Sequence, residues 1–268
     1  YGIDRQSYWM DEAVGIHDAG KESLNDLFSS LKKDQPVTPF YFIALHFWMI
    51  LFGISELSTR FLSLLFSIFS IPLIFLVVKK VSNDKTALLT SLIFAVSIPE
   101  IAFAQETRYY AGFTFFSIVS TYLFIKIILE KEKFYNYFFF FLTSVLALYT
   151  SYYAIMLLFL HLSSFIFIKN KDVKNKFKKV LFCQILIGLV FIFWLPIFID
   201  QFSYFHPFVK EIFLAYNFPG FISDLGLFLF IFPAIALFFT IILFYFLDKK
   251  YSLGNLIKNF IKNNPILI

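Results

Sequence analysis

Residues 61–78, with the sequence FLSLLFSIFSIPLIFLVV, form a continuous apolar run that contains no charged side chain. A helix that crosses the hydrocarbon core of a bilayer needs about 20 mostly apolar residues, so this run predicts a membrane-spanning helix. The whole chain has the same character: 59% of its 268 residues are hydrophobic and 15% are charged. Soluble domains have about 45–50% apolar and about 25% charged residues. The composition therefore excludes a water-soluble enzyme and a nucleic-acid-binding domain.

Further apolar segments predict an all-α, polytopic membrane protein with about seven transmembrane helices. Residues 134–168 are too long for one span, so we expect a turn at Tyr149–Tyr153. The segment 39–54 is apolar but short and is bounded by Pro39 and Gly53, which favours a buried or interfacial helix. The predicted spans are 61–78, 87–104, 111–129, 134–151, 153–168, 180–199 and 226–247.

The distribution of charge between the loops predicts the orientation of the chain. Cytoplasmic loops carry an excess of Lys and Arg. If the seven spans alternate, the loops on one side have net charge +11 and those on the other, counted with Glu100 near that end of its span, have −6, which together give the chain's +5. The positive group, assigned to the cytoplasm, consists of 79–86, 130–133 with Lys126, 169–179 and 248–264. We therefore expect residues 1–60 to form an extracytoplasmic loop with juxtamembrane helices, 61–247 the transmembrane domain, and 248–268 a cytoplasmic loop leading into a further span of a longer protein.

Two adjacent carboxylates, Asp11 and Glu12, follow Tyr8 and Trp9 in the predicted outer segment. Neighbouring residues on a helix point about 100° apart, so the two acids cannot perform the same task. One can face a reaction centre while the other holds a helix end or a basic partner. The alternative is that both acids merely favour the start of a helix, where negative charge suits the macrodipole.

A second polar cluster, Gln105–Ala111, joins two predicted spans on the same side. Glu106 and Arg108 lie there at the membrane surface, where ionisable residues are costly and are candidates for function. The planar guanidinium of an Arg donates two hydrogen bonds to a phosphate. The alternatives are that Glu106 and Arg108 pair with each other or that Arg108 contacts lipid headgroups. The hydroxyl-rich turn Tyr149–Tyr153 is a third cluster, although tyrosines also populate the membrane interface of any membrane protein.

Other chemistries find no support among the sequence motifs. The four histidines show no metal-ligand spacing, Cys183 has no disulfide partner, and no phosphate-binding or dinucleotide fingerprint occurs. A carboxylate and an Arg at an outer lipid boundary suit the transfer of a group from a lipid phosphate to an acceptor. The Arg would stabilise the leaving phosphate, and the carboxylate would take a proton from an acceptor hydroxyl.

The order of these motifs resembles the membrane glycosyltransferases of the GT-C superfamily. The resemblance is closest to the branch related to protein O-mannosyltransferases and lipid A aminoarabinose transferases. The HPP of that branch reads Val37-Thr38-Pro39 here, so its His and one Pro are missing, and the His of its YTHYYA is Ser151. The stretches that carry the resemblance are SYWMDEA (7–13), TPFYFIALHFW (38–48), FGISELSTRF (52–61), QETRYYA (105–111), YTSYYA (149–154) and WLPIFIDQ (194–201).

The resemblance implies an inverting glycosyltransferase at the outer face of the plasma (inner) membrane. It would move a sugar from a polyprenyl-phosphate donor to a glycan, lipid or protein acceptor. Asp11 would be the catalytic base and Glu12 its neighbour, while a divalent metal is left open. An O-antigen-type polymerase, a lipid-linked sugar transporter or flippase, and a non-catalytic relative are the alternatives. The implied donor-binding residues are Arg108, Glu106, Gln105 and Tyr110, and the implied substrate contacts are Tyr149, Tyr152, Tyr153, Trp9 and Tyr41.

Overall fold

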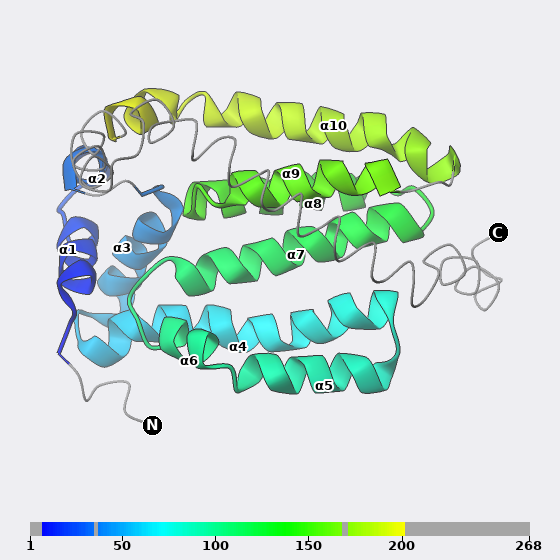
Figure 1. Cartoon of the computed structure of the whole chain (residues 1–268). Helices are drawn as coiled ribbons and strands as arrows, with labels where there is room; N and C mark the ends of the chain where they lie inside the picture. Colours follow the sequence, from blue (N-terminus) through cyan, green and yellow to red (C-terminus); the bar gives the residue numbers. More distant parts are fainter. Residues whose placement is uncertain (1–6, 35–36, 168–170, 202–268) are drawn as a thin grey trace, which may run out of the picture.

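A computed structural model of the chain describes residues 7–34, 37–167 and 171–201 (Figure 1). Every regular element within this part is a helix, which confirms the predicted all-α class. The predicted span 226–247 and the segment 248–268 lie outside the described residues. The helices are α1 (Met10–Ala19), α2 (Leu24–Asp34), α3 (Phe40–Phe52), α4 (Glu56–Val81), α5 (Asp84–Ala95), α6 (Ile98–Ala104), α7 (Tyr110–Leu129), α8 (Phe134–Thr150), α9 (Ala154–Phe167) and α10 (Lys171–Phe191).

Local sequence explains where several of these helices begin and end. The side chain of Ser55 accepts a hydrogen bond from the backbone N–H of Ser58 and so caps the start of α4, and Asn83 caps α5 through Thr86 in the same way. Gly53 follows α3 with a φ of +76°, a conformation that glycine adopts without steric cost. The short apolar segment between Pro39 and Gly53 is therefore a separate helix, as predicted.

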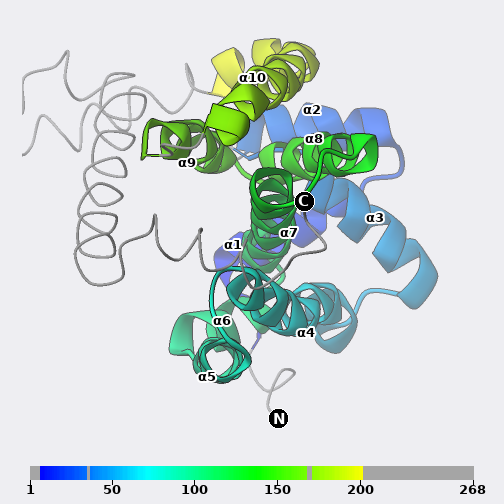
Figure 2. The same ribbon diagram turned by 90° about the vertical axis from the view of Figure 1, so that its right-hand side faces the viewer.

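Helix α7 lies at the centre of the bundle (Figures 1 and 2). The pair α4 and α5, with the short α6, packs on one side of it, and α8, α9 and α10 lie on the other. Small side chains bring the backbones close together, as is common between membrane helices. Ser67 and Ser70 of α4 are buried, and the hydroxyls of Ser120 in α7 and Ser144 in α8 share a buried hydrogen bond of 2.8 Å.

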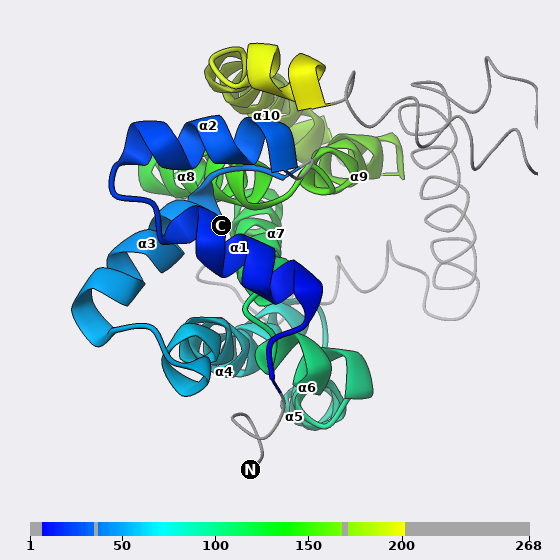
Figure 3. The ribbon, with the colours of Figure 1, turned by 90° about the vertical axis from the view of Figure 1, so that its left-hand side faces the viewer.

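The three N-terminal helices form a layer across one end of this bundle (Figure 3). Its apolar core contains Ile16 of α1, Tyr41 and Leu45 of α3, and Leu62 of α4. Helix α2 adds a second cluster centred on Leu27, Leu31 and Phe42. The turns between α6 and α7 and between α8 and α9 reach the same end of the bundle (Figure 1). The motifs of residues 7–60 and 105–111 therefore meet in space.

A buried network attaches this layer to the far side of the bundle. The side-chain amide of Gln201 donates hydrogen bonds to the carbonyls of Leu31 and Val37, at 2.8 and 3.0 Å. The side-chain oxygen of Gln201 accepts a hydrogen bond from the Tyr152 hydroxyl at 2.6 Å. The Tyr152 hydroxyl in turn accepts a hydrogen bond from the indole N–H of Trp194. Residues from α2, from the α8–α9 turn and from the segment after α10 are thus fixed to one another.

The chain is a multi-pass membrane protein by the length and apolarity of its helices, but the structure does not show seven spans. Among the described residues, α4 and α7 are each long and apolar enough to cross a bilayer. Two bent pairs, α5 with α6 at 58° and α10 with Leu195–Gln201 at 65°, raise the number to four if each pair is one span. The predicted spans 134–151 and 153–168 correspond to α8 and α9, which have 17 and 14 residues because the turn between them divides the apolar run.

Candidate active site

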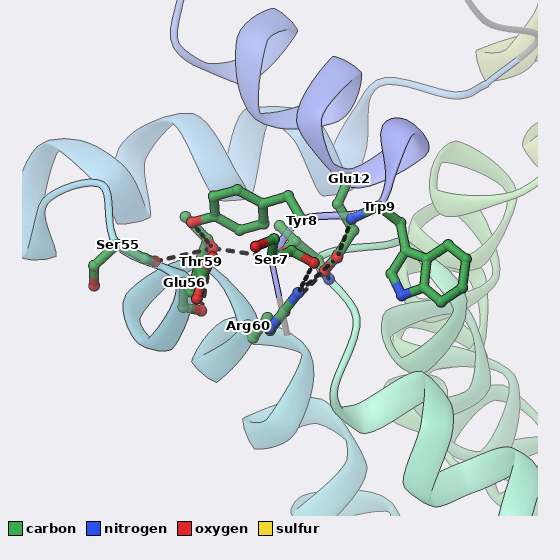
Figure 4. Close-up of polar contacts among 9 residues, drawn as sticks. Ser7, Tyr8, Trp9, Glu12, Ser55, Glu56, Thr59 and Arg60 are labelled. Atoms are coloured by element: carbon green, nitrogen blue, oxygen red, sulfur yellow. Dashed lines mark hydrogen bonds and ion pairs between the residues drawn. The ribbon is translucent and has the colours of Figure 1, made fainter. Parts of the chain in front are cut away.

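The site is organised around a buried ion pair between Glu12 of α1 and Arg60 of α4 (Figure 4). The guanidinium donates through Nε to Oε1 at 3.0 Å and through Nη2 to Oε2 at 2.8 Å. Only 3% of the Arg60 side chain and 1% of the Glu12 side chain are exposed. Two parallel hydrogen bonds in a desolvated setting make this a strong and directional contact.

The Glu12 carboxylate also binds two backbone N–H groups. Oε1 accepts from Thr107 at 2.7 Å, and Oε2 accepts from Trp9 at the start of α1 at 3.1 Å. Burial raises the pKa of Glu12, but the hydrogen bonds from Arg60, Thr107 and Trp9 outweigh it, so the pKa lies below its ordinary value of 4.5. One ionised side chain therefore joins α1, α4 and the α6–α7 connection.

Hydroxyl groups extend this polar cluster along the start of α4. The Tyr8 and Thr107 hydroxyls both lie 3.1 Å from the hydroxyl of Thr59, and the Tyr8 ring packs over the Arg60 guanidinium. Figure 4 shows Tyr8, Thr59 and Arg60 converging below the first turn of α1. The buried charges are thus surrounded by satisfied polar groups, as buried charges require.

Asp11 points away from this buried pair. Its side chain is 73% exposed, and its carboxylate lies 3.7 Å from Nη2 of Arg108. Nη1 of Arg108 donates to the backbone carbonyl of Asp11 at 3.1 Å. The structure therefore separates the two neighbouring acids, because one is anchored inside while the other stands at the surface beside a guanidinium.

The backbone of Arg108 is fixed by a hydrogen bond from helix α4. Its carbonyl accepts a hydrogen bond from Ser63 at 3.2 Å, and the Ser63 hydroxyl shares another with the buried Tyr41 hydroxyl at 2.8 Å. The Tyr109 and Tyr110 rings lie about 5.5 and 5.8 Å from the guanidinium. Tyr110 therefore lies beside the Arg108 guanidinium, whereas Tyr41 supports the Arg108 backbone from the core through Ser63.

Glu106 and Gln105 belong to the same connection between α6 and α7. The Glu106 side chain is half-buried, and Gln105 is exposed. Burial raises the pKa of the Glu106 carboxyl, and the negative charge of Glu12 raises it further, while Arg108 opposes both effects. The predicted donor-binding residues thus share one short segment, and Arg108 is the member that reaches Asp11.

The aromatic residues proposed as substrate contacts divide into two groups. Trp9 lies exposed at the start of α1, next to Asp11. Tyr149 and Tyr152 belong to the opposite side of the layer, where their hydroxyls bind the carbonyl of Val190 and the side chain of Gln201. Tyr153 is half-exposed in the α8–α9 turn. The structure brings Trp9 to the acidic cluster and places Tyr149 and Tyr152 in supporting contacts.

Arg60 is the main site residue to which sequence reasoning gave no role. It occurs in the quoted FGISELSTRF stretch, and a charged residue at the start of an apolar span is itself a feature that calls for a partner. Its distance of 48 positions from Glu12 hides the pairing. Thr59 and Thr107 were missed for the same reason.

Among residues 7–34, 37–167 and 171–201, no group of three or more His, Cys, Asp or Glu side chains could hold a metal ion.

Replacing Glu12 by Gln is expected to destabilise the fold. The substitution leaves the Arg60 guanidinium buried without its counter-charge, which costs about 3–5 kcal/mol. Denaturant unfolding of the purified protein in detergent measures the loss. The matched control is Asp11→Asn, which should change the unfolding free energy by less than about 1 kcal/mol because Asp11 is exposed. Equal effects of the two substitutions would contradict the anchoring role of Glu12.

The same carboxylate makes stability depend on pH. Because the pKa of Glu12 is lowered by folding, its contribution is fully present above the ordinary value of 4.5. That contribution is lost as the pH falls through the lower pKa of the folded state. Thermal melts of the wild type between pH 7 and pH 3 should show this loss, and Glu12→Gln should decline less steeply. Parallel curves for the two proteins would refute the assignment.

Comparison with known proteins assigns the chain to a family. A family model described as dolichyl-phosphate-mannose-protein mannosyltransferase matches residues 34–199. A protein of Aquifex aeolicus (strain VF5), described as uncharacterized, is 28% identical over 134 residues, which cover 49% of this chain and 26% of that relative. The matched part thus spans about a quarter of the relative's length. No solved structure matches the chain significantly. The chain belongs to the dolichyl-phosphate-mannose-protein mannosyltransferase family.

Proposed function

We propose that the protein transfers a sugar from a polyprenyl-phosphate donor to an acceptor hydroxyl at the membrane surface. The observation that carries this proposal is the juxtaposition of the exposed Asp11 carboxylate and the largely buried Arg108 guanidinium, which lie 3.7 Å apart. The family model supports the donor class, since its description names a dolichyl-phosphate sugar. In such a displacement the carboxylate can accept the proton of the acceptor hydroxyl, and the guanidinium can stabilise the leaving phosphate.

Arg108 is the residue that we assign to the donor phosphate. Its guanidinium stands on the α6–α7 connection, fixed through Ser63 and flanked by the rings of Tyr109 and Tyr110. Charge-assisted hydrogen bonds from Arg to a phosphate grow stronger as the sugar–phosphate bond breaks and negative charge develops on the leaving oxygen. Gln105, Glu106 and Tyr110 would contact the donor from the same segment.

Asp11 is the residue that we assign as general base. Its exposed carboxylate can accept the proton of the acceptor hydroxyl while that oxygen attacks the anomeric carbon. Attack opposite to the departing phosphate inverts the configuration in a single step. Glu12 does not share this task, because Arg60 and two backbone N–H groups occupy its oxygens. It positions Asp11 by fixing the first turn of α1.

The position of the site in the membrane forms part of the proposal. The seven predicted spans, with the basic loops in the cytoplasm, would put α1, α2 and α3 on the extracytoplasmic face of the inner membrane. There the site meets a lipid-linked donor and a glycan, lipid or protein acceptor. Trp9, exposed beside Asp11, would contact the acceptor. In the structure, the α6–α7 and α8–α9 turns reach the end of the bundle that α1–α3 cover (Figure 1).

Replacing Asp11 by Asn should remove transfer while the protein still folds. General bases contribute about 10²–10⁴-fold in rate, so a loss of at least about 100-fold is expected. The assay follows donor-dependent sugar transfer in membranes that contain equal amounts of each variant. Asp26→Asn, which changes an exposed carboxylate of α2, is the matched control and should remain active. Full transfer by Asp11→Asn would remove the base from this proposal.

Replacing Arg108 by Ala should weaken use of the donor more than use of the acceptor. Hydrogen bonds to charged groups contribute about 1.5–3 kcal/mol, so kcat/KM for the donor should fall by about 10-fold to 100-fold. The KM of the acceptor should stay within about twofold. Arg108→Lys keeps the charge without the planar fork and should recover part of the loss. Equal losses for both substrates would argue against a phosphate contact.

A further inference from the structure

A cavity of about 170 Å³ lies between α4, the end of α5 and α6. It exists because α6 turns away from α5 by 58° and leaves space against α4. Pro99 at the start of α6 lacks an N–H and so favours this break. Ser67 lines the cavity one helical turn beyond Ser63, which holds the Arg108 carbonyl. The cavity therefore lies directly below the candidate active site.

A carboxyl group stands in this mostly apolar cavity. Glu100 of α6 lines it, and its Oε2 is buried without a hydrogen-bond partner in the part of the chain that the structure describes. The side chains that share the cavity with it are apolar apart from Ser67 and Gln105, and none of these lining residues is basic. A carboxylate oxygen in such surroundings is costly unless a donor or a cation reaches it.

The mouth of the cavity faces the apolar exterior. Ile68 of α4 and Ile101 of α6 line the cavity and are about half exposed. Leu88, Leu92 and Ile93 of α5, which come before the cavity-lining Phe94, are exposed apolar side chains as well. In a membrane protein such a surface lies against acyl chains. A molecule that enters here would carry its polar group inward and leave its tail outside.

The size of the cavity limits what can enter. A cavity needs about 10–15 Å³ of space to hold one water molecule, so this one has room for several small groups. A short polar headgroup fits such a space. A primary ammonium group brings a positive charge and N–H donors to Glu100, with the lining residue Gln105 as a further polar contact.

We propose that this cavity binds the headgroup of an amine-bearing phospholipid, with its ammonium on Glu100 and its acyl chains along α5. The site does not depend on the proposed glycosyl transfer, because binding can be measured without any sugar donor. It would place a membrane lipid one helical turn from the segment that carries Arg108.

The test reconstitutes the purified chain in lipid discs made of equal amounts of phosphatidylethanolamine and phosphatidylcholine. The choline headgroup is trimethylated and has no N–H donor, so it is the matched lipid control. After detergent exchange, native mass spectrometry counts the lipids that remain bound. The wild type should retain one phosphatidylethanolamine with a preference of about tenfold or more.

Three variants make the outcome decisive. Glu100→Gln removes the negative charge with little change of shape and should reduce the preference to about one. Ile68→Trp should do the same by closing the half-exposed mouth, even if Glu100→Gln were poorly folded. Glu22→Gln, an exposed carboxylate outside the cavity, should behave as the wild type.

Two results would overturn the proposal. One is a wild type without preference between the lipids, or a Glu100→Gln variant that retains it, because a neutral amide cannot replace the counter-charge of an ammonium. The other is binding of soluble phosphoethanolamine to the protein in phosphatidylcholine discs while phosphatidylethanolamine shows no preference. That result would assign the cavity to a free amine and not to a lipid.

Discussion

The buried pair of Glu12 and Arg60 is the contact on which the rest of the site depends. It joins two helices that are separated by nearly 50 positions in the chain, and both side chains are withdrawn from water. Because a buried charge without its partner is strongly unfavourable, this ion pair favours the observed position of α1 beside the start of α4. The backbone of Thr107 binds the same carboxylate, so the α6–α7 connection is placed by this contact as well.

This anchoring also determines what Asp11 can do. Once Glu12 points into the bundle, its neighbour must point about 100° away on the same helix. That direction leads to the surface and to Arg108, whose backbone is held by Ser63 of α4. The exposed acid and the guanidinium are therefore placed by buried interactions that take no part in a proton transfer. Glu12 fixes the first turn of α1, and its neighbour Asp11 presents the carboxylate that is proposed to act as the base.

Much of the helical architecture follows from sequence alone, since apolar runs, Pro39, Gly53 and the Tyr149–Tyr153 turn correspond to helices and breaks in the structure. Single spans were predicted less well. The run 87–104 contains a 58° bend near Pro99. Hydropathy reports how apolar a segment is, but not the direction of its helix axis. The division of the acids into one inner and one outer residue was predictable from helix geometry, but the choice between them was not.

The sequence by itself determined that the chain is helical and belongs in a membrane, because composition and apolar length depend on no long-range contact. It also supplied the residue types of the site and their order. Only the tertiary structure decided that Arg60 pairs with Glu12 and that Arg108 lies beside Asp11. It also decided that the Tyr152 hydroxyl binds Gln201 and not the acidic cluster. Pairings of this kind depend on which surfaces are buried together, and side chains far apart in the chain become neighbours only when the helices pack.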